Sequence, residues 1–334
     1  MRNNLIDIAK FIASILVILI HTPLFDDTNT IMWQFDAILR LAVPFFIICS
    51  GYYLGKNLES IDEKVLTIQS NSKYFLVFLK KMCSIYVVWS IVYLIVYIPS
   101  WIESGWFSTF AFVDWGIATV FKGSYYHLWY ILDMIYAVIA LMIIIKTVPI
   151  SKFPIVAISL YAVEVIQYGY RILLPEKIKS IFDIFDSIGC LSSITRVLPI
   201  ILLGIYISKK AVNNKKISAY VVCFAIAFVC LVIERNILAS FGQENVSYII
   251  FTLPVTYFLF IVLVNSKLNI ESFNTKNLSQ ISIYIYLIHP IFIELLEQVQ
   301  IESEWLNALI IILLSIISSY LIVLCTKVLK ERRA

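Results

Sequence analysis

Charge is scarce in this 334-residue sequence, in which 14% of the residues are Asp, Glu, Lys or Arg and 61% are hydrophobic. Soluble domains carry about 25% charged residues. This deficit excludes an ordinary water-soluble domain and places the chain among proteins that cross a membrane several times. The formal net charge of +4 is small. We attribute it to lysine-rich loops and expect no nucleic-acid partner.

Motifs built on cysteine are also missing. Six cysteines are present, of which five fall in apolar stretches and Cys190 falls in an expected outer loop. No Cys-x-x-Cys pair and no Cys/His spacing typical of zinc occurs. We therefore expect neither a disulfide framework nor a metal site. The sequence also lacks a serine-elbow motif, an internal repeat and a soluble domain, so we expect one transmembrane domain over 1–334.

Apolar stretches are abundant, and a helix needs about 20 residues to cross the hydrocarbon core of a bilayer. Ten candidate spans can be drawn: 4–24, 32–54, 74–98, 127–147, 153–173, 192–210, 217–234, 247–266, 278–297 and 304–327. The first has no small-residue cleavage site, so we interpret it as a retained helix and not a signal peptide. The pattern predicts an all-α, polytopic membrane protein with about ten transmembrane helices.

Basic residues alternate between the expected loops. The basic segments are 55–73, 146–152, 209–216, 267–277 and the C-terminus, whereas 25–31 and 298–303 contain no lysine or arginine. Because lysine and arginine are enriched in cytoplasmic loops, both termini are expected to be cytoplasmic. Segment 174–191, with Lys177 and Lys179, fits this pattern least well.

The expected outer loop 99–126 is rich in aromatic residues. They are Trp101, Trp106, Phe107, Phe110, Phe112, Trp115, Tyr125 and Tyr126. Two interpretations stand side by side. The loop is either part of an interfacial aromatic belt, or a re-entrant segment that lines an acceptor groove, because flat aromatic faces suit sugar rings.

Histidine is rare, and all three histidines lie in or at the edge of apolar segments: His21, His127 and His289. An ionisable residue inside a membrane segment usually marks function, and a charged one costs roughly 2.5–3.5 kcal/mol at mid-helix unless it pairs or faces water. The predicted orientation places further polar residues at a similar depth, in the outer half of the bilayer: Arg40, Asp133, Arg196 and Glu234. We expect one shared cavity.

Lys10 lies closer to the cytoplasmic side than these residues. It precedes His21 by eleven positions, which is about three helical turns plus 20°, so both side chains share one helix face about 16 Å apart. This arrangement suits a channel that an anionic or thioester-bearing cofactor enters from inside, with chemistry nearer the outside.

Structural interpretations remain open for several of these residues. Lys10 would equally well extend to the inner interface or pair with Asp7 three positions earlier. His127 would bond to a loop carbonyl at the interface, and His289 would satisfy a carbonyl released by Pro290.

Two further positions have similar alternatives. Arg196 would only anchor a helix end, and the Ser50-Gly51 pair would only allow close helix packing. His21 is the residue hardest to explain in structural terms alone.

Five stretches, in order along the chain, carry a family resemblance. They are IDIAKFIASILVILIH with Asp7, Lys10 and His21, RLAVPFFIICSGYYL, HLWYI at His127, LPIILLGIYI at 198–207, and ISIYIYLIHPIFI with His289. Together they resemble the membrane-bound acyltransferase family called acyltransferase 3. The family's first helix carries an acidic residue, an arginine, ten residues and a histidine. Here Lys10 replaces the arginine, which keeps the charge and loses the bidentate fork.

A subgroup is also indicated. The VIER stretch with Glu234, followed by SYIIFTLPVTYFLF at 247–260, resembles the membrane domains of vancomycin-resistance serine racemases. Those proteins carry a C-terminal racemase domain, of which this sequence shows none.

The resemblance implies a transferase in the bacterial cytoplasmic membrane. It would move an acyl group, most often acetyl, from cytoplasmic acyl-CoA (acetyl-CoA) to a hydroxyl of a cell-envelope glycan or lipid-linked sugar. His21 would act as general base, and Glu234 would orient a histidine or bind a sugar hydroxyl. Lys10 would contact the donor, and Arg40 or Arg196 would stabilise the oxyanion. The other residues expected at the donor and acceptor sites are Ser50, His127, Trp129, Tyr286 and His289.

Two other function classes compete with this one. A proton-coupled exporter would use the histidines and carboxylates as a proton relay, although the lack of an internal repeat disfavours it. A membrane sensor or partner subunit is the other alternative, and the lack of a soluble output domain disfavours that.

Overall fold

A computed structural model describes residues 3–22, 30–61, 65–66, 68–187, 189–210, 217–243, 247–266, 275–299 and 301–331. These residues are almost entirely helical, which confirms the predicted fold class. The strands in the described part are the short antiparallel pair β1 (Ser60–Ile61) and β2 (Val65–Leu66). The chain forms two compact units: unit 1 holds 1–46, 214–222 and 258–334, and unit 2 holds 47–213 and 223–257.

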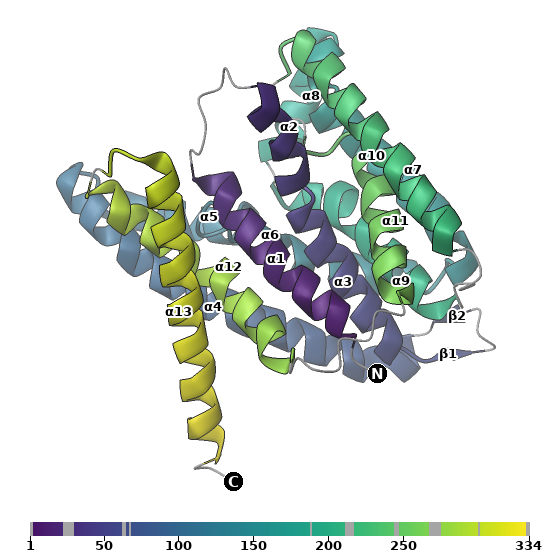
Figure 1. Ribbon diagram of the computed structural model, residues 1–334, viewed down its shortest axis with the longest axis horizontal. Helices are drawn as coiled ribbons and strands as arrows, with labels where there is room; N and C mark the ends of the chain where they lie inside the picture. The colour runs from purple at the N-terminus through teal and green to yellow at the C-terminus, as the bar shows by residue number, and fades with distance from the viewer. Residues whose placement is uncertain are drawn as a thin grey trace. The chain divides into compact units, whose positions relative to one another are not determined.

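Unit 1 is built around the first and last long helices. Its complete helices are α1 (Asn4–His21), α2 (Thr30–Leu39), α12 (Lys276–Glu297) and α13 (Glu304–Glu331). Helix α12 packs against both α1 and α13 (Figure 1). The Asn3 side chain accepts from the N–H groups of Leu5 and Ile6, which satisfies backbone donors at the start of α1. Buried isoleucines, among them Ile18 and Ile285, form the core between these helices.

Unit 2 contains the middle of the chain. Its complete helices are α4 (Ile68–Glu103), α5 (Thr109–Phe121), α6 (Trp129–Ile144), α7 (Phe153–Glu164), α8 (Glu176–Ser187) and α9 (Leu198–Lys209). Three short 3₁₀ turns, η1 (Ile150–Lys152), η3 (Arg171–Leu173) and η4 (Gly189–Leu191), and two π turns, η2 (Val165–Gly169) and η5 (Ser193–Val197), connect or extend them. Helix α9 packs against α6 and α7.

Three helices contribute residues to both units. They are α3 (Ala42–Asn57), α10 (Ile217–Ser240) and α11 (Thr252–Asn265). The second expected span, 32–54, thus comprises α2 and α3 with a break at Arg40 and Leu41. Pro44 explains the break, because it has no N–H to donate to the carbonyl of Arg40 one turn earlier.

Close helix packing in unit 2 depends on glycine. A Cβ atom added to Gly51 on α3 would lie 2.8 Å from the Cα atom of Ile201 on α9. At Gly204 on α9, an added Cβ would lie 2.7 Å from the backbone nitrogen of Tyr52. A side chain at either glycine would force the helices apart, as at other small-residue contacts between membrane helices. This geometry confirms the packing interpretation for Gly51.

Within the described residues, seven helical segments are long and apolar enough to cross a membrane, judged by length and composition. They are Asn4–His21, Gln34–Asn57, Asn71–Glu103, Ile150–Gly169, Ile217–Ser240, Asn277–Glu297 and Glu304–Leu329. The expected spans 127–147, 192–210 and 247–266 contain the shorter helices α6, α9 and α11. The count of ten and the cytoplasmic termini stay predictions. Much of the loop-charge argument falls on 23–29, 211–216 and 267–274, which lie outside the described residues.

Apolar stripes on the long helices support a membrane environment. On α10, side chains that are more than half exposed recur every three or four residues: Ile226, Val229, Ile233 and Ile237. On α13, the side chains of Leu309, Leu313, Ile317 and Leu321, each about half exposed, form a similar stripe. Soluble monomers rarely expose such continuous apolar surface, whereas lipid-facing helices do so along their length. The protein is therefore a multi-pass membrane protein.

Candidate functional site

Two of the three histidines meet in unit 1. His21 is the last residue of α1, and His289 lies in α12, which packs against α1. Their imidazole rings stack with 5.6 Å between centroids and 23° between planes. His289 is fully buried, and the ring of Tyr286, one turn earlier, lies 6.2 Å from its own. The structure thus brings His21 next to two predicted site residues from the far end of the chain, Tyr286 and His289.

The hydrogen bonding of His289 fixes its tautomer. Its Nδ1 lies 3.1 Å from the carbonyl oxygen of Ile285. A carbonyl only accepts, so Nδ1 carries the hydrogen, and Nε2 of the neutral ring carries the lone pair. The ring also bonds to the backbone of Tyr286, whose carbonyl loses its helical partner at Pro290. The proposed link between His289 and the proline is therefore present, alongside the contact with His21.

Lys10 lies on the same unbroken helix as His21. Helix α1 runs without a break over Asn4–His21, so the predicted common face and the separation of about 16 Å apply. Near the start of α1, the Thr275 hydroxyl lies 2.9 Å from the Asn4 side-chain oxygen and 3.4 Å from the buried Asp7 carboxylate. These contacts fix the Lys10 end of α1 to the start of α12.

Arg40 also belongs to unit 1. It directly follows α2, which packs against α1, and its Nε donates to Asp36 Oδ2 at 2.5 Å. Both side chains of this ion pair are about a quarter exposed. The positive charge of Arg40 acts on His21. A cation thus lies in electrostatic range of the histidine pair.

The second group of predicted residues lies in unit 2, where the partly exposed Arg196 forms an ion pair with a buried carboxylate. Its Nε donates to Glu164 Oε1 at 2.7 Å, and the Thr195 hydroxyl donates to the other carboxylate oxygen at 2.7 Å. Glu164 is fully buried. Because a buried carboxylate needs a charge partner and hydrogen bonds, this contact does more than anchor a helix end.

Three aromatic rings surround the guanidinium of Arg196. The rings of Trp129, Tyr168 and Tyr248 lie 5.3, 5.1 and 5.0 Å from its central carbon. Such distances are typical of cation–π contacts. Asp133 of α6 is buried nearby, and within the described residues its Oδ2 has no hydrogen-bond partner. The cluster therefore combines one cation with two carboxylates in an aromatic shell.

Two π turns create this cluster. Turn η2 continues α7 and carries Tyr168, while η5 precedes α9 and carries Thr195 and Arg196. A π turn widens the helix by one residue and is frequent at functional sites. The irregular backbone thus aims side chains from two neighbouring segments at Glu164.

His127 is buried just before α6. The rings of Tyr93, Tyr125 and Tyr126 lie 4.8, 5.7 and 5.7 Å from its ring, in edge-on arrangements. The residue therefore belongs to an aromatic cluster near the C-terminal end of α4. Ser50 of α3, also in unit 2, bonds to the side chain of Tyr130 on α6.

Glu234 connects α10 to the start of α11. Its carboxylate accepts from the backbone N–H groups of Ile250 at 2.7 Å and Phe251 at 2.9 Å, and from the Tyr170 hydroxyl at 2.6 Å. A carboxylate at a helix N-terminus satisfies unpaired donors and complements the helix dipole. These contacts give Glu234 a clear structural role, and its catalytic role stays a prediction.

Comparisons with known proteins assign this chain to a family. A family model described as an acyltransferase domain matches residues 3–324, nearly the whole chain. The chain belongs to the acyltransferase 3 family. It is 25% identical to an "Amino-acid racemase" of Enterococcus faecalis over 96% of this chain, and 26% identical to a "Serine/alanine racemase" of Enterococcus gallinarum over 95%. The chain spans slightly less than half the length of these relatives. No solved structure matches.

The predicted site residues lie in both units. Unit 1 holds Lys10, His21, Arg40, Tyr286 and His289, and unit 2 holds Ser50, His127, Trp129, Arg196 and Glu234. Contacts link His21 to His289, and Trp129 to Arg196. One cavity shared by all of them stays a prediction.

Sequence reasoning missed Glu164. The signal was available, because this residue is an acidic side chain inside the apolar stretch 153–173, and such residues are rare without a partner. Its partner Arg196 lies 32 positions later, a separation that no local pattern reveals. The surrounding Tyr168 and Tyr248 look like ordinary membrane aromatics in the sequence.

Proposed function

We propose that this acyltransferase 3 protein moves an acyl group, most simply acetyl, from cytoplasmic acyl-CoA to a hydroxyl of a cell-envelope carbohydrate. The observation that carries the proposal is the stacked pair of His21 and His289, with Lys10 three turns away from His21 on the same helix. A neutral imidazole is the usual general base near neutral pH.

In the proposed reaction, the acceptor hydroxyl attacks the carbonyl carbon of the thioester while its proton passes to His21. The tetrahedral oxyanion then collapses, the carbon–sulfur bond breaks, and the coenzyme A thiolate takes the proton back from His21. The products are an ester and free coenzyme A. Direct transfer of this kind requires no serine nucleophile.

The neighbours of His21 have defined parts in this scheme. His289 packs against the base and holds it in one orientation, a condition for efficient proton transfer. The charge of Arg40, already in range of His21, is placed to stabilise an oxyanion that forms beside the base. Tyr286 fills the adjacent space.

Lys10 would bind the donor at the other end of α1. An ammonium group attracts phosphate as a point charge, and coenzyme A carries its phosphates far from its thioester. The separation of about 16 Å along the helix therefore lets one elongated donor contact Lys10 while its thioester reaches His21.

The test is acyl transfer by the purified protein in nanodiscs, given acetyl-CoA labelled in the acetyl group and a glycan fraction from the cell envelope. We expect release of free coenzyme A and transfer of label to the glycan, both lost in His21→Ala. Release of coenzyme A at the same rate with His21→Ala would refute the assignment of the base.

A second candidate function is proton-coupled transport, which the two buried carboxylates, Asp133 and Glu164, beside Arg196 favour. Carboxylates within membrane helices are typical of proton relays. The racemase relatives are about twice as long as this chain. A membrane sensor or partner subunit would also suit the part of them that this chain matches. Proton uptake into proteoliposomes without any release of coenzyme A would favour transport over acyl transfer.

A further inference from the structure

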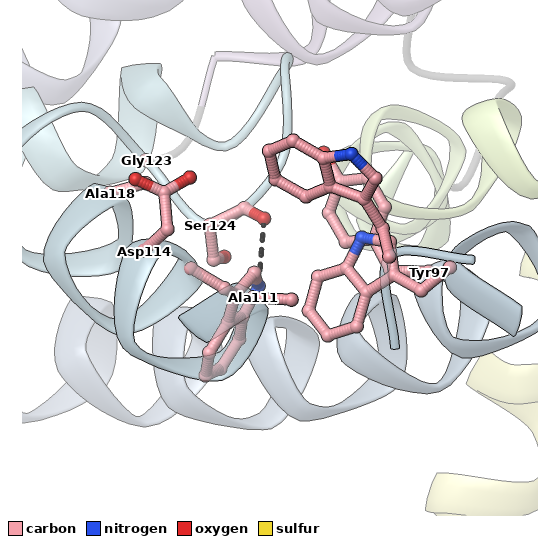
Figure 2. A pocket seen from close by; sticks show the side chains of 9 residues that line it. Tyr97, Ala111, Asp114, Ala118, Gly123 and Ser124 are labelled. Atoms are coloured by element: carbon pink, nitrogen blue, oxygen red, sulfur yellow. Dashed lines mark hydrogen bonds between the residues drawn. The ribbon is translucent and has the colours of Figure 1, made fainter. Parts of the chain in front are cut away.

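A pocket of about 200 Å³ lies in unit 2 between the end of α4 and the start of α6. It is lined by Tyr97, Trp101, Trp106, Ala111, Asp114, Trp115, Ala118, Gly123 and Ser124. Figure 2 shows Asp114 and Ser124 on one side of the pocket and Tyr97 on the other. Pockets for drug-sized ligands measure roughly 300–1,000 Å³, so this pocket has room for about one small ring.

The pocket is formed by the aromatic segment 99–126. Helix α4 supplies Tyr97 and Trp101, whose rings stack with 5.7 Å between centroids and 9° between planes. Gly105 then turns the chain with a φ of 71°, a conformation that glycine adopts without strain. The N–H of Trp106 donates to the carbonyl of Trp101 at 2.8 Å, which closes the turn.

Helix α5 presents two different faces. Its exposed side chains include Phe110, Val113, Ile117 and Val120. These residues follow helical spacing, so they form one apolar stripe suited to lipid. Asp114, Trp115 and Ala118 line the pocket. This division favours a segment that lies in the membrane interface and covers a site.

Hydrogen bonds hold the pocket walls in place. The Trp115 indole N–H donates to the carbonyl of Ser124 at 3.2 Å. The Tyr86 hydroxyl of α4 donates to the carbonyl of Thr119 at 2.5 Å and accepts from the N–H of Ser124 at 3.1 Å. The hydroxyls of Ser90 and Ser124 lie 2.6 Å apart. The pocket is therefore preformed, which lowers the entropic cost of ligand binding.

The groups that remain for a ligand define its chemistry. Within the described residues, neither the Asp114 carboxylate nor the indole N–H of Trp101 or Trp106 forms a hydrogen bond. The carboxylate accepts from up to two hydroxyls, the indoles donate, and the aromatic faces offer flat apolar surface. A sugar ring matches all three, because it has an apolar C–H face and a rim of hydroxyls that both donate and accept.

We propose that this pocket binds one sugar ring of the acceptor. The choice of a saccharide rests on the proposed function, whereas the presence of a ligand site rests on the pocket itself. Aromatic rings with a carboxylate also suit a quaternary ammonium group. A sugar fits better, because a quaternary ammonium offers no acceptor to the two indole N–H groups.

The experiment is a ligand titration of the protein in nanodiscs, with saturation-transfer difference NMR as the readout of binding. The probes are glucose, galactose, rhamnose and N-acetylglucosamine, with choline as the competing cation. We expect at least one of the four sugars to bind. Its dissociation constant should rise about tenfold or more in Trp106→Ala and about threefold to tenfold in Asp114→Asn.

Two matched variants serve as controls. Trp305→Ala removes a tryptophan that is 58% exposed, compared with 56% for Trp106, and Glu103→Gln removes a nearby negative charge that does not line the pocket. Both should bind sugar as the unaltered protein does. Thermal unfolding of all four variants checks that each is folded. We expect no loss of fold in Trp106→Ala, because this side chain is exposed.

The outcomes separate this proposal from the acyltransferase proposal. Binding of none of the four sugars, binding of choline alone, or equal weakening in the controls would each overturn the sugar pocket. Sugar binding that depends on Trp106 and Asp114 supports it, even if acetyl-CoA is never consumed. Acyl transfer without such binding would support the acyltransferase proposal and refute the sugar pocket.

Discussion

The two polar clusters of this protein are built on different principles. In unit 1, the imidazole at the end of α1 stacks on an imidazole within α12, with a cation in range. In unit 2, the cation Arg196 faces the carboxylate of Glu164 and is enclosed by three aromatic rings. The first contact is a stack of like groups and the second is a pairing of opposite charges.

This difference supports our proposal that the histidine pair of unit 1 carries the chemistry, while the ion pair of unit 2 stabilises the fold. A buried ion pair gains its energy by staying intact, because either partner alone would be a charge without compensation. Imidazoles exchange protons at little cost near neutral pH, so a histidine pair suits a reaction in which a proton is taken up and returned. We therefore expect variants in unit 1 to lose rate and variants of the unit 2 ion pair to lose stability.

The largest effect is expected for His21→Ala. Removal of a positioned general base lowers turnover about 10²–10⁴-fold, while acyl-CoA should still bind because the proposed donor contacts lie elsewhere on α1. Turnover and donor binding measured on the purified variant give the comparison. Ile12→Ala, which alters an exposed side chain of the same helix, should leave both unchanged. Normal turnover by His21→Ala would show that the reactive group lies outside the histidine pair.

For Glu164→Gln we expect a loss of stability instead of a direct loss of turnover. This change leaves Arg196 without its anionic partner, and breaking a buried ion pair costs about 3–5 kcal/mol of stability. Unfolding in detergent should show the loss. The double variant with Arg196→Met should regain part of it, since neither member of the Glu164–Arg196 pair is then left as a charge without its partner, although Asp133 loses its neighbouring cation. A double variant as unstable as the single one would contradict the assignment of Arg196 and Glu164 as a pair.

A matched ion pair in the same unit serves as control. Lys179 and Glu176 pair at 2.7 Å, but the Glu176 side chain is 86% exposed. Such pairs contribute about 0–1 kcal/mol. Glu176→Gln should therefore unfold almost as the unaltered protein does, and a large loss there would mean that the assay reports net charge instead of burial.

Glu234 is a residue for which a structural role and a catalytic role give different predictions. Glu234→Gln places an amide where a carboxylate accepts from two backbone N–H groups and the Tyr170 hydroxyl. Facing donor against donor costs about 1–3 kcal/mol. If the residue belongs to the framework, stability falls and the turnover of the folded protein changes little. Turnover reduced a hundredfold at unchanged stability would make Glu234 catalytic, as the family resemblance suggests.

Composition and motif order were sufficient to predict the all-helical membrane fold and its family, because apolar length and the histidine motifs are local properties of the chain. The break at Arg40 and the π turns beside Arg196 were not predicted, since both depend on how single backbone groups are satisfied within packed helices. Contacts across long separations, such as Glu164 with Arg196 and His21 with His289, also required the structure. The pocket among the aromatics of 99–126 was anticipated only as one of two interpretations.

The smallest effect is expected for Lys10. It tests whether α1 binds the donor at Lys10 and carries the general base at His21. Lys10 lies about 16 Å from His21, too far for both side chains to touch one reacting carbon. Lys10→Ala should therefore raise the KM for acyl-CoA by roughly tenfold, a loss of about 1.4 kcal/mol, with little change in kcat. Lys10→Arg should keep or improve donor affinity, because a guanidinium binds phosphate through two parallel hydrogen bonds. Steady-state kinetics on both variants decide the matter. A fall in kcat at constant KM for Lys10→Ala would place this residue in the chemical step and refute separate roles for Lys10 and His21.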